Sequence, residues 1–190
     1  ETVWQYYDRN NHDLSTQLGA ELEYWLNSKV YLDISDNVTY SRTRTVRDIY
    51  TDNSEENIVG GMPTTPDLAN AMGNLMHKWK NSFTLKSTIK PVKSFMIMPK
   101  FNWNVYREKA NYHYGQLDTA AVRTSYTYEP SIFLKWKMSR VRNMDFSFAY
   151  NTTVPDLVST LGYRNTINPL SISVGNPFLR KSHSHTTKYS

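Results

Sequence analysis

The stretch "WKNSFTLKSTIKP", residues 79 to 91, alternates large apolar residues with polar ones. Its odd positions include Trp79, Phe83, Leu85 and Ile89, and most of its even positions are lysine, serine or threonine. Side chains alternate between the two faces of a β-strand, so this pattern predicts a strand with one apolar and one polar face. The segment from Trp79 to Ile89 would be roughly 33 Å long, well beyond the usual globular strand of about five or six residues. At a tilt near 40° it would rise about 25 Å, the height of the apolar band of an outer-membrane barrel.

The same period of two recurs in other segments of the chain. In "SFMIMPKFNWNVYR", residues 94 to 107, Phe95, Ile97, Phe101 and Trp103 share one face. The pattern continues in residues 125–138 and 144–150, and near the start in residues 14–26 and 30–38. Asp36 and Arg42 are exceptions, because they occupy the apolar register. Counting about eight such segments, we expect an all-β fold, namely an antiparallel up-and-down transmembrane β-barrel of which this chain is a part.

The expected connections fall into two classes. Tight turns are predicted around Asn27 and Ser28, around Val92 and Lys93, and at residues 139–142. Long polar stretches separate the other strand ends, at Thr45–His77, Lys109–Val122 and Thr153–Lys181. Short turns at one end and long loops at the other are typical of transmembrane barrels. Aromatic residues near both ends of the strands would form the two interfacial girdles of such a barrel: Trp79, Tyr40, Tyr126, Tyr128 and Tyr150 toward the loops, Tyr24 and Trp136 toward the turns.

Alternation alone does not identify the solvent on each face. A soluble sheet with one wet face has the same pattern as a barrel with lipid outside and water inside. The alternative is therefore a soluble all-β carbohydrate- or protein-binding module, in which the aromatic side chains are buried or form a binding face. The length of the segments and the sorting of the connections favour the barrel.

Two of the long connections contain locally helical patterns. In "TTPDLANAMGNLMH", residues 64 to 77, Thr65 is a suitable N-cap and Pro66 suits the first helical position. "VPDLVSTLG", residues 154 to 162, has the same arrangement of proline, aspartate and leucine before a glycine. We expect a short helix in each segment, packed on its loop.

Composition limits the functional classes. The 190 residues suffice for one β domain or part of a larger one, and the net charge of +5 comes from basic residues spread along the chain, which argues against nucleic acid as a partner. No run of apolar residues approaches the length of a spanning helix, and there is no cysteine. No catalytic motif or nucleotide fingerprint is present, and His183 and His185 have no visible third metal ligand. We therefore expect no enzyme, no cofactor and no metal site.

A family resemblance lies in "VPDLVSTLGYRNTINPLSISVGNPFLRKSHSH", residues 154 to 185. A Pro-Asp-Leu segment leads to Asn-Pro-Leu at Asn168, then to Gly-Asn-Pro-x-Leu at Gly175, and then to a polar strand containing His183. In this order and spacing the run resembles Bacteroidetes outer-membrane barrels of the TonB-dependent receptor type. The resemblance covers about 30 residues, and the rest of the chain is compatible in its strand pattern. It implies that residues 1–190 are part of one outer-membrane β-barrel domain, whose plug domain, TonB box and remaining strands lie outside this sequence.

The resemblance also implies a function. The parent would take up a nutrient such as a glycan, peptide or chelate across the bacterial outer membrane, and its partners would be outer-membrane lipid, a TonB-type energising protein and a surface lipoprotein. Tyr112, Tyr114 and Tyr163 are then candidates for ligand contact from the extracellular loops. The polar positions of the alternating strands would line a wet lumen: Glu21, Glu23, Asp33, Lys86, Asn102, Asn104, Glu129 and Lys135.

Overall fold

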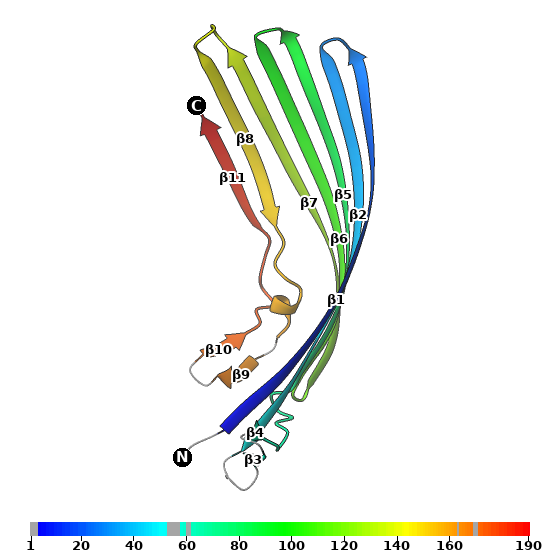
Figure 1. Cartoon of the computed structure of the whole chain (residues 1–190), viewed down its shortest axis with the longest axis vertical. Helices are drawn as coiled ribbons and strands as arrows, with labels where there is room; N and C mark the ends of the chain where they lie inside the picture. Colours follow the sequence, from blue (N-terminus) through cyan, green and yellow to red (C-terminus); the bar gives the residue numbers. More distant parts are fainter. Residues whose placement is uncertain (1–3, 53–57, 60–61, 163, 169–170) are drawn as a thin grey trace.

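The computed structural model describes residues 4–52, 58–59, 62–162, 164–168 and 171–190. Seven strands form one antiparallel sheet, in the order β1-β2-β5-β6-β7-β8-β11. Each strand lies beside the next long strand along the chain, and the sheet curves strongly along its length (Figure 1). The expected all-β, antiparallel, up-and-down architecture is therefore confirmed. The strands are β1 (Trp4–Asn27), β2 (Val30–Asp52), β5 (Met72–Val92), β6 (Phe95–Tyr114), β7 (Leu117–Lys137), β8 (Asn143–Thr153) and β11 (Ser182–Tyr189).

All three predicted tight turns are present, at one end of the sheet. They connect β1 to β2, β5 to β6 and β7 to β8, and lie together at the top of Figure 1. In the first of them the side-chain oxygen of Asn27 accepts hydrogen bonds from the backbone N–H groups of Lys29 and Val30, at 2.8 and 3.0 Å. This local capping explains how so short a connection reverses a long strand.

The opposite end carries the long connections. The predicted loop Thr153–Lys181 is confirmed, since β8 ends at Thr153 and β11 begins at Ser182. It contains the short strands β9 (Arg164–Asn168) and β10 (Ser171–Val174), which pair with each other. The connection from β2 to β5 contains a second small hairpin, β3 (Ile58–Val59) with β4 (Met62–Pro63).

The expected loop Lys109–Val122 is wrong, because this segment is a continuous hairpin. Strand β6 runs to Tyr114, and Lys109 pairs with Val122 across the ladder to β7. The strands β2 and β5 likewise extend beyond the positions where the sequence suggested a loop. In the extension of β6 the apolar side chains change face: Ala110, Tyr112 and Tyr114 lie on the concave face, and Lys109 and Asn111 lie on the convex face. The apolar register that marks the rest of the strand therefore ends there, although the backbone pairing continues.

The turn of this hairpin requires glycine. Gly115 has a φ of 56°, and a Cβ added to it would lie 2.3 Å from the carbonyl oxygen of Ala69. The Gly115 N–H donates to the carbonyl of Ala71 at 3.0 Å, so the segment before β5 packs on the tip of the hairpin. Only a residue without a side chain fits both the backbone conformation and the close approach.

The predicted helix near Thr65 is absent. The backbone N–H of Asp67 donates to Ile49 in β2, and Thr65 accepts from Thr51, so this segment bonds to the end of β2. Met72 already belongs to β5. Sheet pairing has therefore overridden the local helical pattern. The second expected helix is a single 3₁₀ turn, η2 (Val158–Thr160), whose N–H groups at Val158 and Ser159 donate to the carboxylate of Asp156.

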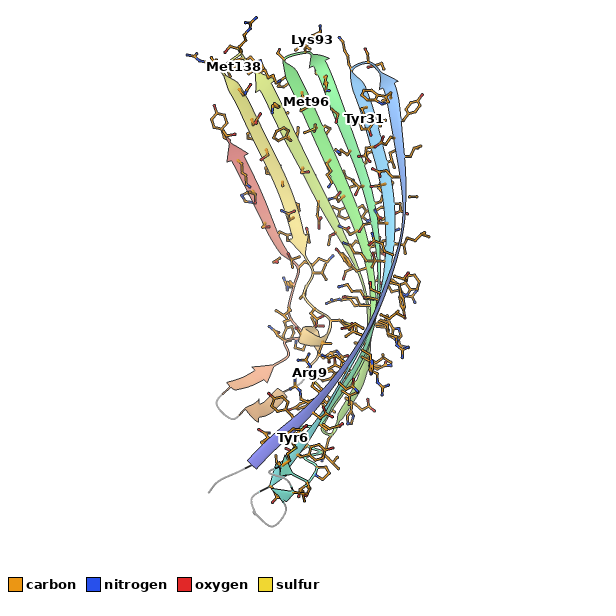
Figure 2. The ribbon with its side chains drawn as sticks, in the orientation of Figure 1. Tyr6, Arg9, Tyr31, Lys93, Met96 and Met138 are labelled. Atoms are coloured by element: carbon orange, nitrogen blue, oxygen red, sulfur yellow. The ribbon has the colours of Figure 1, made fainter. Side chains whose placement is uncertain are left out.

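The distribution of side chains between the two faces of the sheet is the reverse of that in a soluble protein. Trp79, Trp103 and Tyr128 are 51%, 39% and 54% exposed, whereas Asn104 and Thr127 on the other face are 5% and 1% exposed. Side chains project from both faces of the sheet along its whole length (Figure 2). One exception on the apolar face is Asp36, whose carboxylate accepts a hydrogen bond from the Asn81 amide at 2.9 Å.

The apolar core is small and lies at the loop end of the polar face. Ile49 of β2 is buried there with Ala110, Tyr112 and Tyr114 of β6, and Leu157 is buried within the β8–β11 connection. Among the described residues, no helix is both long and apolar enough to span a membrane.

Candidate functional site: the polar concave face

The strand register places the eight predicted lumen-lining residues on one face of the sheet. Glu23 pairs with Asp33, Asp33 with Lys86, and Asn102 with Glu129, so their side chains leave the sheet on the same side. This is the concave face, over which the β8–β11 connection folds (Figure 1). The same register also places the remaining three there: Glu21, Asn104 and Lys135.

Near the tight turns the polar face holds an ion pair. The Nζ of Lys86 lies 3.4 Å from an Asp33 carboxylate oxygen, and the lysine is more exposed than the aspartate. One step along β5, the hydroxyl of Thr84 donates to the Asn102 side-chain oxygen at 3.0 Å. These cross-strand contacts hold the polar side chains against the concave face of the sheet. Their contribution to stability is modest, as it is for other exposed ion pairs.

A chain of hydrogen bonds crosses the middle of this face. The Ser82 hydroxyl donates to the Asn104 side-chain oxygen at 2.7 Å, and the Asn104 amide donates to the Thr127 hydroxyl at 3.0 Å. Thr127 in turn donates to a carboxylate oxygen of Glu129 at 3.3 Å. Asn104 therefore uses both its donor and its acceptor, which explains why it is tolerated in a buried position.

Closer to the loops, Glu108 is the centre of a charged cluster. It is 2% exposed and lies 3.1 Å from the Lys78 Nζ and 2.6 Å from the Arg123 Nη2. Arg123 also donates to the backbone carbonyl of Pro155, in the β8–β11 connection. One buried carboxylate thus links three strands, and through Arg123 it fixes the connection against the concave face.

Two lysines flank an aromatic ring next to this cluster. The Nζ atoms of Lys78 and Lys80 lie 5.5 and 5.6 Å from the ring centroid of Tyr106. Cations within about 6 Å of an aromatic face are attracted by its quadrupole. The concave face therefore presents fixed charges of both signs, hydroxyls, amides and a cation-flanked ring, a surface suited to water and polar solutes.

The candidate ligand-contacting tyrosines lie in different surroundings from those expected. Tyr112 and Tyr114 belong to β6 instead of a loop, and their rings stack with centroids 6.5 Å apart. Both are buried, and the Tyr114 hydroxyl donates to the side-chain oxygen of Asn70 in the segment that precedes β5. Tyr163 lies outside the described residues.

Sequence reasoning missed the central cluster. Glu108 and Arg123 were not singled out, because they adjoin the segment interpreted as a loop. The signal that could have found them is the period of two itself. Glu108 continues the even positions of Asn102 and Asn104 in β6, and Arg123 continues the odd positions of Thr127 and Glu129 in β7.

Comparisons with known proteins add one finding. No protein-family model matches the chain, and no curated protein matches it. A solved structure of the ferric citrate transporter FecA in its unliganded form is similar, with a TM-score of 0.55 and 11% sequence identity. The match covers 79% of this chain and 22% of FecA, so the chain spans about a fifth of the length of that transporter. At this identity the likeness shows the fold alone: the curved antiparallel sheet is similar to part of the FecA fold.

Proposed function

We propose that this chain is a wall section of an outer-membrane receptor that takes up a polar nutrient. The observation that carries the proposal is the reversed arrangement of the faces on strands of 20 or more residues, apolar and exposed on one side, polar and buried on the other. A sheet in water would expose the polar face. An apolar exposed face is favourable only where hydrocarbon covers it.

In this proposal the concave face lines the route of the nutrient. Paired charges and hydroxyls along the wall would exchange hydrogen bonds with a glycan, a peptide or a metal chelate as it passes. Energy would come from a TonB-type partner acting on parts of the protein outside this chain, and a surface lipoprotein would cover the loops. The resemblance at residues 154–185 supports a receptor of the Bacteroidetes type, and the similarity of fold to a transporter supports the transport role.

The role of the tyrosines is proposed in a narrower form. Tyr112 and Tyr114 would contact ligand only after the segment around Asn70 has moved away from them, since that segment bonds to Tyr114. Tyr163 is proposed as a ligand contact on the basis of the resemblance alone.

The experiment that tests the proposal deletes the complete protein from its host. The deletion strain is grown on separate panels of polysaccharides as the sole carbon source, peptides as the sole nitrogen source, and chelates as the sole iron source. The protein is located in the wild-type strain by separating membrane from soluble fractions. We expect it in the outer-membrane fraction, and we expect a growth defect on one nutrient class that the wild-type protein restores. Recovery in the soluble fraction, or normal growth on every panel, would contradict the proposal.

A further inference from the structure

A group of basic residues lies on the convex face of the sheet, just beyond the apolar band. On β2 the apolar register ends at Tyr40 and is followed by Arg42 and Arg44, and on β6 it ends at Val105 and is followed by Arg107 and Lys109. We call Arg42, Arg44, Arg107 and Lys109 the basic belt. All four are exposed.

The belt residues of β2 and β6 are connected through two rows of side chains that cross β5. Tyr40 pairs with Trp79 and Trp79 with Arg107, which forms one row across β2, β5 and β6. The next row on the same face consists of Arg42, His77 and Lys109. Residues two positions apart on a strand are roughly 7 Å apart, so the second row lies directly beyond the aromatic one.

The height of the belt follows from the length of the band. The convex register extends over eleven residues, that is ten steps, along each of four strands: Val30–Tyr40, Trp79–Ile89, Phe95–Val105 and Tyr126–Trp136. Each such span is roughly 33 Å long and rises about 25 Å at the tilt of a barrel strand, which matches the hydrocarbon layer. The belt therefore begins where the hydrocarbon ends, on the side of the long loops.

The aromatic and basic rows enclose a hollow. Its volume is about 620 Å³, and it is lined by Tyr40, His77, Trp79, Arg107 and Lys109. The ring centroids of Tyr40 and Trp79 lie 4.7 Å apart, and the Tyr40 hydroxyl is 2.8 Å from Nδ1 of His77. These contacts hold the aromatic side chains of the hollow in place. Among the described residues, no carboxylate lines this hollow. Asp13 and Asp118 line two neighbouring hollows, each of which also includes Arg42 and Arg44.

No described residue forms an ion pair with a belt residue. Within the described ranges, the ion pairs of the chain involve Lys78, Lys86 and Arg123, all on the concave face. Cations on a barrel exterior are costly within the hydrocarbon, whereas at the membrane surface they are attracted to anionic lipid headgroups.

From this geometry we infer that the basic belt binds the phosphate groups of an anionic lipid headgroup in the loop-side leaflet. Trp79 and Tyr40 would contact the upper part of the acyl chains, and the guanidinium groups and the ammonium group would bind the phosphate oxygens. This inference rests on the proposed function, since it requires the convex face to meet lipid. It adds a specific lipid as a bound component of the receptor.

The test uses the complete protein purified in detergent, with lipid A as the probe. Bound lipid is measured by native mass spectrometry and by titration, for the wild type and for the triple variant Arg42→Ser, Arg107→Ser, Lys109→Ser. A matched control removes three exposed charges at the opposite end, Lys93→Ser, Arg140→Ser and Arg142→Ser; Lys93 marks that end in Figure 2. We expect the triple variant to bind lipid A about a hundredfold more weakly, and the control to bind it as the wild type does.

Two further arms identify the ligand. Dephosphorylated lipid A should bind wild type and triple variant equally weakly, and inorganic phosphate should not displace lipid A. If the triple variant does not fold, the single change Lys109→Ser replaces it, with an expected loss of about fivefold. Equal binding by wild type and variant, or undiminished binding of dephosphorylated lipid, would overturn the inference, and displacement by inorganic phosphate would replace the lipid with a free anion. In each of those cases, recovery of the protein in the outer-membrane fraction leaves the proposed function unaffected. Recovery in the soluble fraction would contradict both the proposed function and the lipid-binding inference.

Discussion

Trp103 and Asn104 are neighbours in β6, yet their surroundings are opposite. Trp103 lies on the convex face and is exposed, whereas Asn104 lies on the concave face and is buried with both its amide groups hydrogen-bonded. The same contrast separates Tyr128 from Thr127 in β7. On one face of the sheet the polar side chains satisfy one another, and on the other face large apolar side chains are exposed. Under the proposed function, the two faces therefore contact different media, water and hydrocarbon.

The largest effect is expected where the concave face carries a buried charge. Glu108→Ala removes the carboxylate that Lys78 and Arg123 share and leaves Arg123 without its acidic partner. We expect the free energy of unfolding to fall by about 3 kcal/mol and the connection held by Arg123 to become sensitive to protease. Lys78→Gln is the control, because this lysine is more exposed and its loss leaves the Arg123 bond intact. Equal effects of the two variants would show that Glu108 is not the centre of the cluster.

The second prediction compares the two faces by placing the same positive charge on each of them. Leu85 is on the convex face near the middle of the band, and Thr84 beside it is on the concave face. Leu85→Arg should lower the stability of the protein in a bilayer by about 2–4 kcal/mol, whereas Thr84→Arg should be tolerated by a wet wall. Urea titration of both variants refolded in lipid vesicles measures the difference. A larger loss for Thr84→Arg would reverse the assignment of the faces.

The third prediction concerns the loop end of the concave face, where the polar side chains give way to the small apolar core. Gly115→Ala forces a side chain into a left-handed conformation against Ala69, which should cost about 1–3 kcal/mol and loosen the cover over Tyr114. Gly162→Ala is the matched control, since its nearest neighbour, Pro177, is 3.9 Å from the added Cβ. Hydrogen exchange at residues 64–71 reports the loosening. Unchanged exchange in Gly115→Ala would mean that the cover does not depend on this turn.

The smallest effect is expected at a residue that belongs to neither face. Asn27→Ala removes two hydrogen bonds to the backbone of the first tight turn, for a loss of about 1 kcal/mol. Thermal unfolding in detergent checks the value. A loss as large as that of Glu108→Ala would indicate that the turns, more than the faces, determine stability.

Much of the fold could be predicted from the sequence because alternation is a local signal. In the strands from Trp79 to Ile89 and from Phe95 to Val105, every second residue reports the face on which it lies. The tight turn at Asn27 and the strand at His183 were also predictable, from turn chemistry and from the order of motifs respectively. The eight polar residues expected on one face were found together there, although their contact with water inside a barrel stays a prediction.

The rest could not be predicted because it depends on contacts between distant segments. The helix expected after Thr65 failed, since the backbone there bonds to the end of β2 instead. Toward the hairpin tip at Gly115 the apolar side chains change to the concave face, as at Tyr112 and Tyr114, so the register that marks the rest of the strand is interrupted. Alternation could place Glu108 and Arg123 on the polar face, but the bond from Arg123 to Pro155 joins residues 32 positions apart, and no spacing in the sequence encodes that contact.

The central claim is that hydrocarbon meets the convex face and water the concave face. Spin labels placed singly at residues 101 to 105 of the complete protein, reconstituted in a bilayer, test it most directly by their collision rates with oxygen and with a water-soluble nickel complex. We expect collisions with oxygen to dominate at Phe101, Trp103 and Val105, and collisions with the nickel complex to dominate at Asn102 and Asn104. Uniform accessibility along the five positions, or dominance of the nickel complex at Trp103, would contradict it.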